Sequence, residues 1–126
     1  MSDFVTAINC MDGRVQLPVI HWMQEKYNVP YVDMITEAGP TKVILEGTDQ
    51  QVKAIQSKLQ VSTDAHGSKV LAVVGHEGCA GNPVPREKKT EQIKQSIELI
   101  RSWGYPFDEI VGLYVNGDWE VEVVTG

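Results

Sequence analysis

Positive charge is scarce in this sequence, and long apolar runs are absent from it. The 126 residues include 11 Lys and Arg against 17 Asp and Glu, which gives a formal net charge of −6. Proteins that bind nucleic acid displace counterions with a clustered basic surface, so this balance argues against a nucleic-acid partner. No apolar run approaches the roughly 20 residues that cross a bilayer, and the N-terminal residues carry no basic segment followed by an apolar one. We therefore expect a cytoplasmic protein without membrane or nucleic-acid partners.

Basic side chains gather only in one short cluster, at Arg86, Lys88 and Lys89. Such a run is typical of the solvated start of a helix, and we interpret it in that way.

Cysteine is equally scarce, because Cys10 and Cys79 are the only two. One disulfide would suit a secreted protein, whereas in a reducing compartment such residues are more often buried thiols, metal ligands or reactive groups.

Hydrophobic residues make up 42% of the chain and charged residues 22%, which is typical of a globular protein. A chain of 126 residues can bury one core and is short for two, so we expect a single domain over residues 1–126.

Alternating strand and helix patterns predict an α/β fold. Apolar, partly β-branched runs predict strands at residues 4–8, 31–35, 70–74 and 110–115, and a returning edge strand at 119–124 after the turn signal Asn116-Gly117. Helical spacing predicts helices over residues 16–27, from an N-cap at Thr48 to Ala65, and over 90–103, while residues 41–47 stay open. The apolar face of the first helix is expected at Leu17, Ile20 and Met23, with Val19 and Trp22 on its flanks.

The strand at residues 70–74 is apolar on both faces, which predicts a central, parallel position. We expect a mainly parallel sheet of about four strands in the order 2-1-3-4, with an antiparallel edge strand and helices on both faces. Strand order then reverses between the first and third strands, and ligands of open parallel sheets bind beyond the carboxyl ends at such a point. Cys10 and His76 follow these two strands, so they should meet there.

Cys10, His76 and Cys79 together predict a metal site. Alone, a Cys after a strand is usually a buried hydrophobe, and a His is usually a satisfied structural residue. The combination is more specific, because His76 and Cys79 share a Gly-containing turn and Cys10 ends another strand. Two thiolates and one imidazole form a three-ligand set with which catalytic zinc keeps its fourth position open.

Asp12 and Arg14 have two interpretations, which are compatible with each other. Asp12 suits the N-cap of the following helix, and Arg14 suits a surface cation of its first turn. Residues two apart beyond a strand can also pair, and Asp12 is close enough to Cys10 to reach the metal as a fourth ligand. A bidentate contact from Arg14 would hold Asp12 back and leave that position to water. Zinc-bound hydroxide would then be a nucleophile near neutral pH.

Both groups of site residues resemble motifs of the β-class carbonic anhydrases. Residues 10–15 (Cys-Met-Asp-Gly-Arg-Val) resemble the first motif of that family, and residues 73–79 (Val-Val-Gly-His-Glu-Gly-Cys) resemble its second. Ala38-Gly39 is similar to its intervening loop, and residues 111–114 with Gly117 are similar to its closing strand and turn.

The resemblance implies a zinc domain of this type, with Cys10, His76 and Cys79 as ligands of Zn2+ and with Asp12 and Arg14 as the catalytic dyad. It also implies a carbonate dehydratase, a lyase that hydrates carbon dioxide reversibly to bicarbonate. A homodimer or higher homo-oligomer is implied as well.

The chain departs from the family pattern at several positions. Gly13 stands where the family usually has Ser, and Thr36-Glu37 stands where it usually has Arg-Asn. The chain begins almost at its first strand, so we expect the N-terminal helical arm of the family to be absent. Two other functions stay open. One is hydrolysis of an isostere of carbon dioxide, such as carbonyl sulfide or carbon disulfide; the other is that of a non-catalytic zinc protein in which Asp12 closes the metal.

Overall fold

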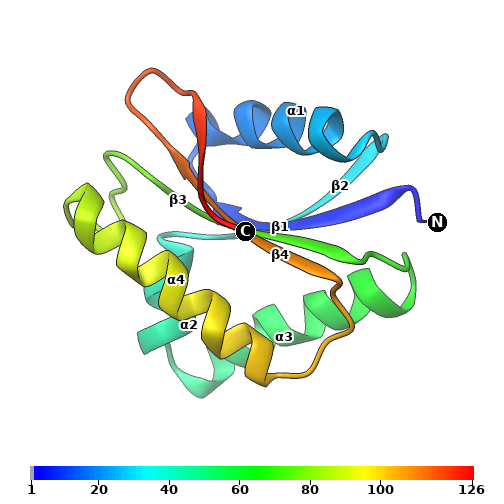
Figure 1. The fold of residues 1–126 in the computed structure, drawn as a ribbon. Coiled ribbons are helices and arrows are strands. Elements are labelled where there is room, and N and C mark those ends of the chain that lie inside the picture. Colours follow the sequence, from blue (N-terminus) through cyan, green and yellow to red (C-terminus); the bar gives the residue numbers. More distant parts are fainter. Residues whose placement is uncertain (1) are drawn as a thin grey trace.

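The computed structural model describes residues 2–126 and contains a five-stranded sheet with helices on both faces (Figure 1). The elements in chain order are β1 (Phe4–Cys10), the 3-10 helix η1 (Gly13–Val15), α1 (Gln16–Tyr27), β2 (Tyr31–Glu37), α2 (Pro40–Glu46), α3 (Asp49–Asp64), β3 (Val70–His76), α4 (Arg86–Ser102), β4 (Glu109–Val115) and β5 (Val121–Thr125). The strand order is β2-β1-β3-β4-β5, in which the first four strands are parallel and β5 is antiparallel to β4. The predicted fold class and strand order are therefore confirmed.

Helix α1 covers one face of the sheet, and α2, α3 and α4 cover the other (Figure 1). Side chains of the strands alternate between these two layers. On β3, Ala72 and Val74 pack in the cluster with α1, whereas Leu71 and Val73 pack in the cluster with the other helices. All four are fully buried (0% exposed), so β3 is the doubly covered, central strand that its composition predicts.

Helix α1 spans the predicted residues, but a different stripe faces the sheet. Val19 and Met23 are fully buried, whereas Leu17 is 61% exposed, so the expected core position of Leu17 is wrong. The turn η1 buries Val15 just ahead of the helix, and Val15, Val19 and Met23 follow one another at four-residue intervals. This turn sets the phase of the helix, and the spacing inside the helix does not contain that information.

Helix α2 fills the stretch that the sequence left open. It begins at Pro40, whose fixed φ suits a first helical turn, directly after Gly39 at φ 70°. Helix α3 has the predicted cap: the Thr48 hydroxyl accepts from the Gln51 backbone, and the Gln51 side chain accepts from the Thr48 backbone. None of the helices in residues 2–126 combines the length and the apolar character needed to cross a bilayer.

The edge strand β5 begins later than expected, at Val121 instead of residue 119. The Trp119 backbone N–H donates to the Asn116 carbonyl (3.0 Å). The Asn116 side-chain oxygen also accepts from the backbone N–H groups of Asp118 (2.9 Å) and Glu120 (3.1 Å). Asn116 thus closes a turn over residues 116–120, which places Trp119 at the carboxyl end of β4 instead of in the sheet.

Candidate metal centre

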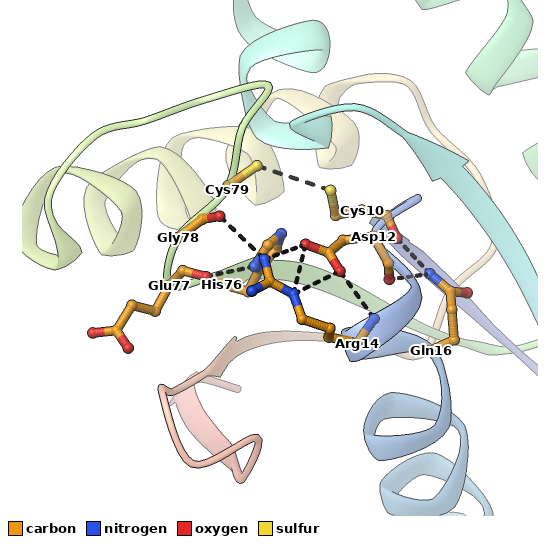
Figure 2. A network of polar contacts seen from close by, with 8 residues as sticks. All are labelled: Cys10, Asp12, Arg14, Gln16, His76, Glu77, Gly78 and Cys79. Atoms are coloured by element: carbon orange, nitrogen blue, oxygen red, sulfur yellow. Dashed lines mark hydrogen bonds and ion pairs between the residues drawn. The ribbon is translucent and has the colours of Figure 1, made fainter.

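The carboxyl ends of β1 and β3 carry the first two predicted ligands. Both strands run two residues further than expected, so Cys10 and His76 are their last residues. Cys79 follows on the turn after β3. One ligand atom from each residue lies within 4.8 Å of those of the other two, and all three residues are buried (Figure 2). The two sulfur atoms are 3.8 Å apart. The structure therefore brings together the three residues that the sequence predicts as ligands, whereas Asp12, the possible fourth ligand, lies outside this cluster.

The imidazole of His76 is held in one orientation by its neighbour. Nδ1 lies 2.7 Å from the Glu77 carbonyl oxygen, which can only accept, so Nδ1 carries the proton and donates. Nε2 is then left with a lone pair. It is buried and finds no hydrogen-bond partner among residues 2–126. A buried polar atom without a partner costs about 1–3 kcal/mol, and this arrangement is the one that metal-binding histidines use.

The two thiols differ in acidity. Burial raises the pKa of the Cys10 thiol, but the neighbouring His76 and hydrogen bonds with the backbone at Gly39 and Asp12 outweigh it and lower the pKa to about 6. For Cys79, burial dominates and raises the pKa, although the positive charge of Lys89 opposes it. Cys10 is therefore the more acidic of the two thiols, and Cys79 would release its proton on binding a metal.

Asp12 and Arg14 pair directly beside the three candidate ligands. The Asp12 carboxylate accepts from Arg14 Nε (3.0 Å) and from Arg14 Nη2 (2.7 Å), and it also caps η1 by accepting from the Arg14 backbone (2.9 Å). Hydrogen bonding from Arg14 lowers the pKa of Asp12 to about 2. Within residues 2–126, the group of clustered ligand atoms contains Cys10, His76 and Cys79 but not Asp12. The two interpretations of Asp12, as helix cap and as ion-pair partner, therefore hold together.

Comparison with known proteins decides the family. The family model described as "Putative carbonic anhydrase" matches residues 1–125. The chain belongs to this family. None of the curated proteins matches it.

Two solved structures of carbonic anhydrases resemble this family member. A carbonic anhydrase from Glaciozyma antarctica shares 17% identity at a TM-score of 0.61, over 95% of this chain and 81% of the other. The β-carbonic anhydrase CafA of Aspergillus fumigatus shares 12% identity at a TM-score of 0.60, over 97% of this chain and 74% of the other. At such identities the likeness concerns the fold, and the resemblance seen in the sequence motifs is confirmed at the level of the family.

Two residues that sequence analysis missed support the Asp12–Arg14 pair in this carbonic anhydrase family member. The Arg14 guanidinium carbon lies 4.8 Å from the centre of the Trp119 ring. The Gln16 side chain donates to the carbonyls of Cys10 (2.6 Å) and Asp12 (3.1 Å), which fixes the turn between ligand and carboxylate. A signal for Trp119 was present, since the turn after a parallel strand lies at the carboxyl end of the sheet, where the ligands are.

Lys89 is the third residue that was missed, and its interpretation as part of a solvated helix start is wrong. It is 2% exposed, and its Nζ donates to the Asn82 carbonyl (2.7 Å). Helix α4 begins at Arg86, four residues before the expected start, and the buried Ile93, Ile97 and Ile100 follow Lys89 on the same stripe. Extending the helical spacing backward from these isoleucines would have placed Lys89 on the buried face.

The loop that carries Cys79 packs tightly against the loop before α2. A Cβ on Gly81 would lie 2.6 Å from the Ala38 carbonyl carbon, and one on Gly39 would lie 2.8 Å from Asn82 Cβ. The buried Asn82 amide donates to Gln92 of α4 (2.6 Å). Glu77, between His76 and this loop, is exposed and points away from the ligands (Figure 2).

Proposed function

We propose that this protein is a zinc-dependent carbonic anhydrase that interconverts carbon dioxide and bicarbonate. The observation that carries the proposal is the buried Cys10–His76–Cys79 cluster, whose His76 Nε2 has no partner among the described residues 2–126, in a chain of the carbonic anhydrase family. Two thiols and one imidazole suit Zn2+, and three protein ligands are the number that leaves a position for a reacting molecule.

The residues around the cluster have distinct tasks in this proposal. Bound zinc would supply a water molecule acidified enough to act as a nucleophile near neutral pH. Asp12 is ionised throughout the neutral range, so its oxygens can accept a hydrogen bond and orient that water. Arg14 engages both carboxylate oxygens, and this contact keeps Asp12 from closing the fourth position. The Asp12–Arg14 contact therefore favours an open site over a closed, non-catalytic one.

Zinc content and carbon dioxide hydration measured on one preparation test the proposal. We expect about one zinc per chain and hydration activity in a stopped-flow assay, both lost in Cys79→Ala. Ala80→Ser changes an exposed neighbour of Cys79 and should leave both unchanged. Protein that purifies without zinc and gains no activity on its addition would contradict the proposal. Turnover of carbonyl sulfide without hydration of carbon dioxide would assign the site to the isostere instead.

A further inference from the structure

We propose that Gln92 of α4 is a positioning residue of the metal centre, which acts through Asn82 to hold Cys79 beside Cys10 and His76. The inference rests on the proposed zinc function and deepens it. It gives a task to a glutamine and an asparagine that the fold buries to 3% and 2% exposure.

Cys79 is the candidate ligand that the sheet does not hold. Cys10 and His76 are the last residues of β1 and β3, and each is paired with a neighbouring strand. Cys79 instead lies in residues 77–85, which form neither helix nor strand. A ligand that must first be ordered weakens binding by the cost of ordering it. The position of Cys79 before an ion arrives therefore depends on the contacts of this loop.

Asn82 closes the turn that begins at Cys79. Its backbone N–H donates to the Cys79 carbonyl (3.3 Å), and its own carbonyl accepts from the Val84 backbone (2.9 Å) and from Lys89 Nζ (2.7 Å). A Cβ on Gly39 would lie 2.8 Å from Asn82 Cβ, so the loop before α2 leaves Asn82 no room to move on that side. Asn82 is thus held from several directions, and Cys79 follows it through one turn.

The side chain of Asn82 is fixed by Gln92. Asn82 Nδ2 donates to Gln92 Oε1 (2.6 Å) and, over a longer distance, to Thr41 Oγ1 (3.3 Å). The Thr41 hydroxyl donates to the same Gln92 oxygen (3.3 Å). All three side chains are buried, and they come from the loop, from α4 and from α2. Gln92 Oε1 is therefore the common acceptor that joins the loop to both helices.

A buried hydrogen-bond network fixes the direction of its members as well as their distance. An apolar side chain at position 92 could fill the same space, but it would leave the Asn82 N–H groups without this acceptor, and a buried polar group without a partner is costly. Hydrogen bonds tolerate a narrow range of distances and angles, so a satisfied network selects one arrangement of the loop. Helix α4 packs on β3, the strand that ends at His76. Gln92 therefore fixes Cys79 relative to the strand that carries another ligand.

Zinc affinity, measured by competition with a chromophoric chelator, tests the inference without a measurement of catalysis. Gln92→Met keeps the length of the side chain and removes the acceptor, and we expect it to weaken zinc binding by about tenfold. Gln92→Glu keeps an oxygen acceptor in either protonation state and should lose less than about threefold. The matched control is Gln95→Met, which changes an exposed glutamine of the same helix and should bind zinc as the wild type does.

A variant that lowers stability elsewhere separates positioning from a merely structural role. Ile55→Val shortens a fully buried side chain of α3, so it should lower the urea midpoint and leave zinc affinity within about twofold of the wild type. Cobalt-loaded protein gives a second readout, because the sulfur-to-cobalt charge-transfer bands report the placement of the thiolates. We expect these bands to change in Gln92→Met and to match the wild type in Ile55→Val.

A double-mutant cycle tests whether Gln92 acts through Asn82. Asn82→Ala removes the donor from the other side of the bond and should weaken zinc binding to a similar extent. If both residues act through one contact, Gln92→Met should cause little further loss in the Asn82→Ala protein. Fully additive losses would show that Gln92 acts by another route and would overturn the inference.

Three further results would overturn it. One is a Gln92→Met protein that binds zinc as tightly as the wild type, and another is a Gln92→Glu protein that loses as much affinity as Gln92→Met, since an acceptor would then not matter. The third needs no variant: hydrogen exchange in the zinc-free wild type should show residues 77–85 protected, and exchange at the rate of an unfolded peptide would contradict this. A wild type that binds no zinc defeats the proposed function itself, whereas a zinc-binding wild type with an indifferent Gln92 defeats this inference alone.

Discussion

Arg14 is the residue at which three parts of the site meet. Its guanidinium pairs with Asp12 and approaches the Gly78 carbonyl within 3.4 Å (Figure 2). It also lies over the ring of Trp119. The side chain therefore connects the turn after β1 with the turn after β3 and the turn after β4. The carboxylate of Asp12 depends on this one cation for its position.

Replacement of Arg14 by Ala should separate metal binding from catalysis. The freed Asp12 carboxylate can move to the metal, so we expect the variant to keep its zinc and to lose about a hundredfold or more in kcat/KM for hydration. Arg101→Ala, which breaks an exposed pair with Glu98 on α4, is the control and should leave both unchanged. Full activity with an unchanged pH profile in Arg14→Ala would show that the pair has no catalytic role.

The ionisation of Asp12 gives a second prediction at this scale. Arg14 holds the pKa of Asp12 at about 2, below its ordinary value of 3.8. A lowered carboxyl pKa stabilises the fold above the unfolded value, and this contribution is lost as pH falls through the folded value. In the zinc-free protein, a 13C titration of the carboxyl carbon should therefore move its midpoint upward toward 3.8 in Arg14→Ala. The stability difference between the two proteins should shrink from pH 4 to pH 2, and an unmoved midpoint would contradict this.

Among the elements, the turn between β4 and β5 holds a large side chain in a conformation that suits glycine. Trp119 has φ 61°, which costs about 1–2 kcal/mol for a residue with a Cβ. Its ring is partly exposed at 37% and covers Arg14. The contact with the guanidinium thus accompanies a backbone strain in the turn.

Two substitutions of Trp119 should separate strain from contact. Both Trp119→Ala and Trp119→Gly lose the cation–π contact, worth about 0.5–1 kcal/mol, so both should lose about two- to fivefold in hydration activity. In urea denaturation the Gly variant should be more stable than the Ala variant by about 1 kcal/mol, because only Ala retains the unfavourable φ. Equal stabilities would mean that the turn relaxes to another conformation once the ring is gone.

In the loop between β3 and α4, we expect the stability of the protein to depend strongly on Gly81. Gly81→Ala would force a methyl group against the Ala38 backbone, so we expect a loss of about 1–3 kcal/mol in the free energy of unfolding together with weaker zinc binding. Gly13→Ser is the control, because nothing lies within 4 Å of a Cβ there, and its effect should stay within about 0.5 kcal/mol. Comparable losses of stability in both variants would show that the close packing of Gly81 against Ala38 is not the cause of the loss.

Strand ends, caps and alternation were predictable from the sequence because their signals are local. Cys10 and His76 end two apolar runs, and a parallel sheet brings such ends together whatever the details of packing. The capping box at Thr48 is also a local signal, because its partner Gln51 lies three residues away. These features account for the predicted strand order and for the gathering of the three ligands.

The remaining features depend on contacts between distant parts of the chain, and the type of each residue does not reveal them, although the helical spacing and the position of the turn contained a signal for Lys89 and for Trp119. The burial of Val19 instead of Leu17 follows from the docking of η1, and the burial of Lys89 follows from the space above Gly75. Trp119 gains its place only because residues 116–120 form a turn instead of a strand. Sequence patterns assign residues to the core or the surface by their type. By type, Leu17 was expected in the core and Lys89 at the surface, and both expectations were wrong.

At the scale of the whole molecule, exposed apolar side chains favour assembly. Met11 and Leu17, which flank η1, are 64% and 61% exposed, and Val123 on the edge strand is 58% exposed. We expect sedimentation to show a homodimer at micromolar concentration, and Leu17→Glu to weaken it. Val61→Glu, at a 56% exposed position on α3, is the control. An active monomer at this concentration would contradict the prediction.

The separation of the ligands along the chain also orders events during synthesis. Cys10 and Cys79 are 69 residues apart, and at about 5–20 residues per second Cys10 is made some 3–14 seconds before Cys79 exists. Until Cys79 is made, the nascent chain holds one thiol of the pair, so it can neither complete the three-residue cluster nor close an internal disulfide. A metal held by this cluster would therefore be acquired only after Cys79 has been translated, and Cys10 would remain a free thiol until then.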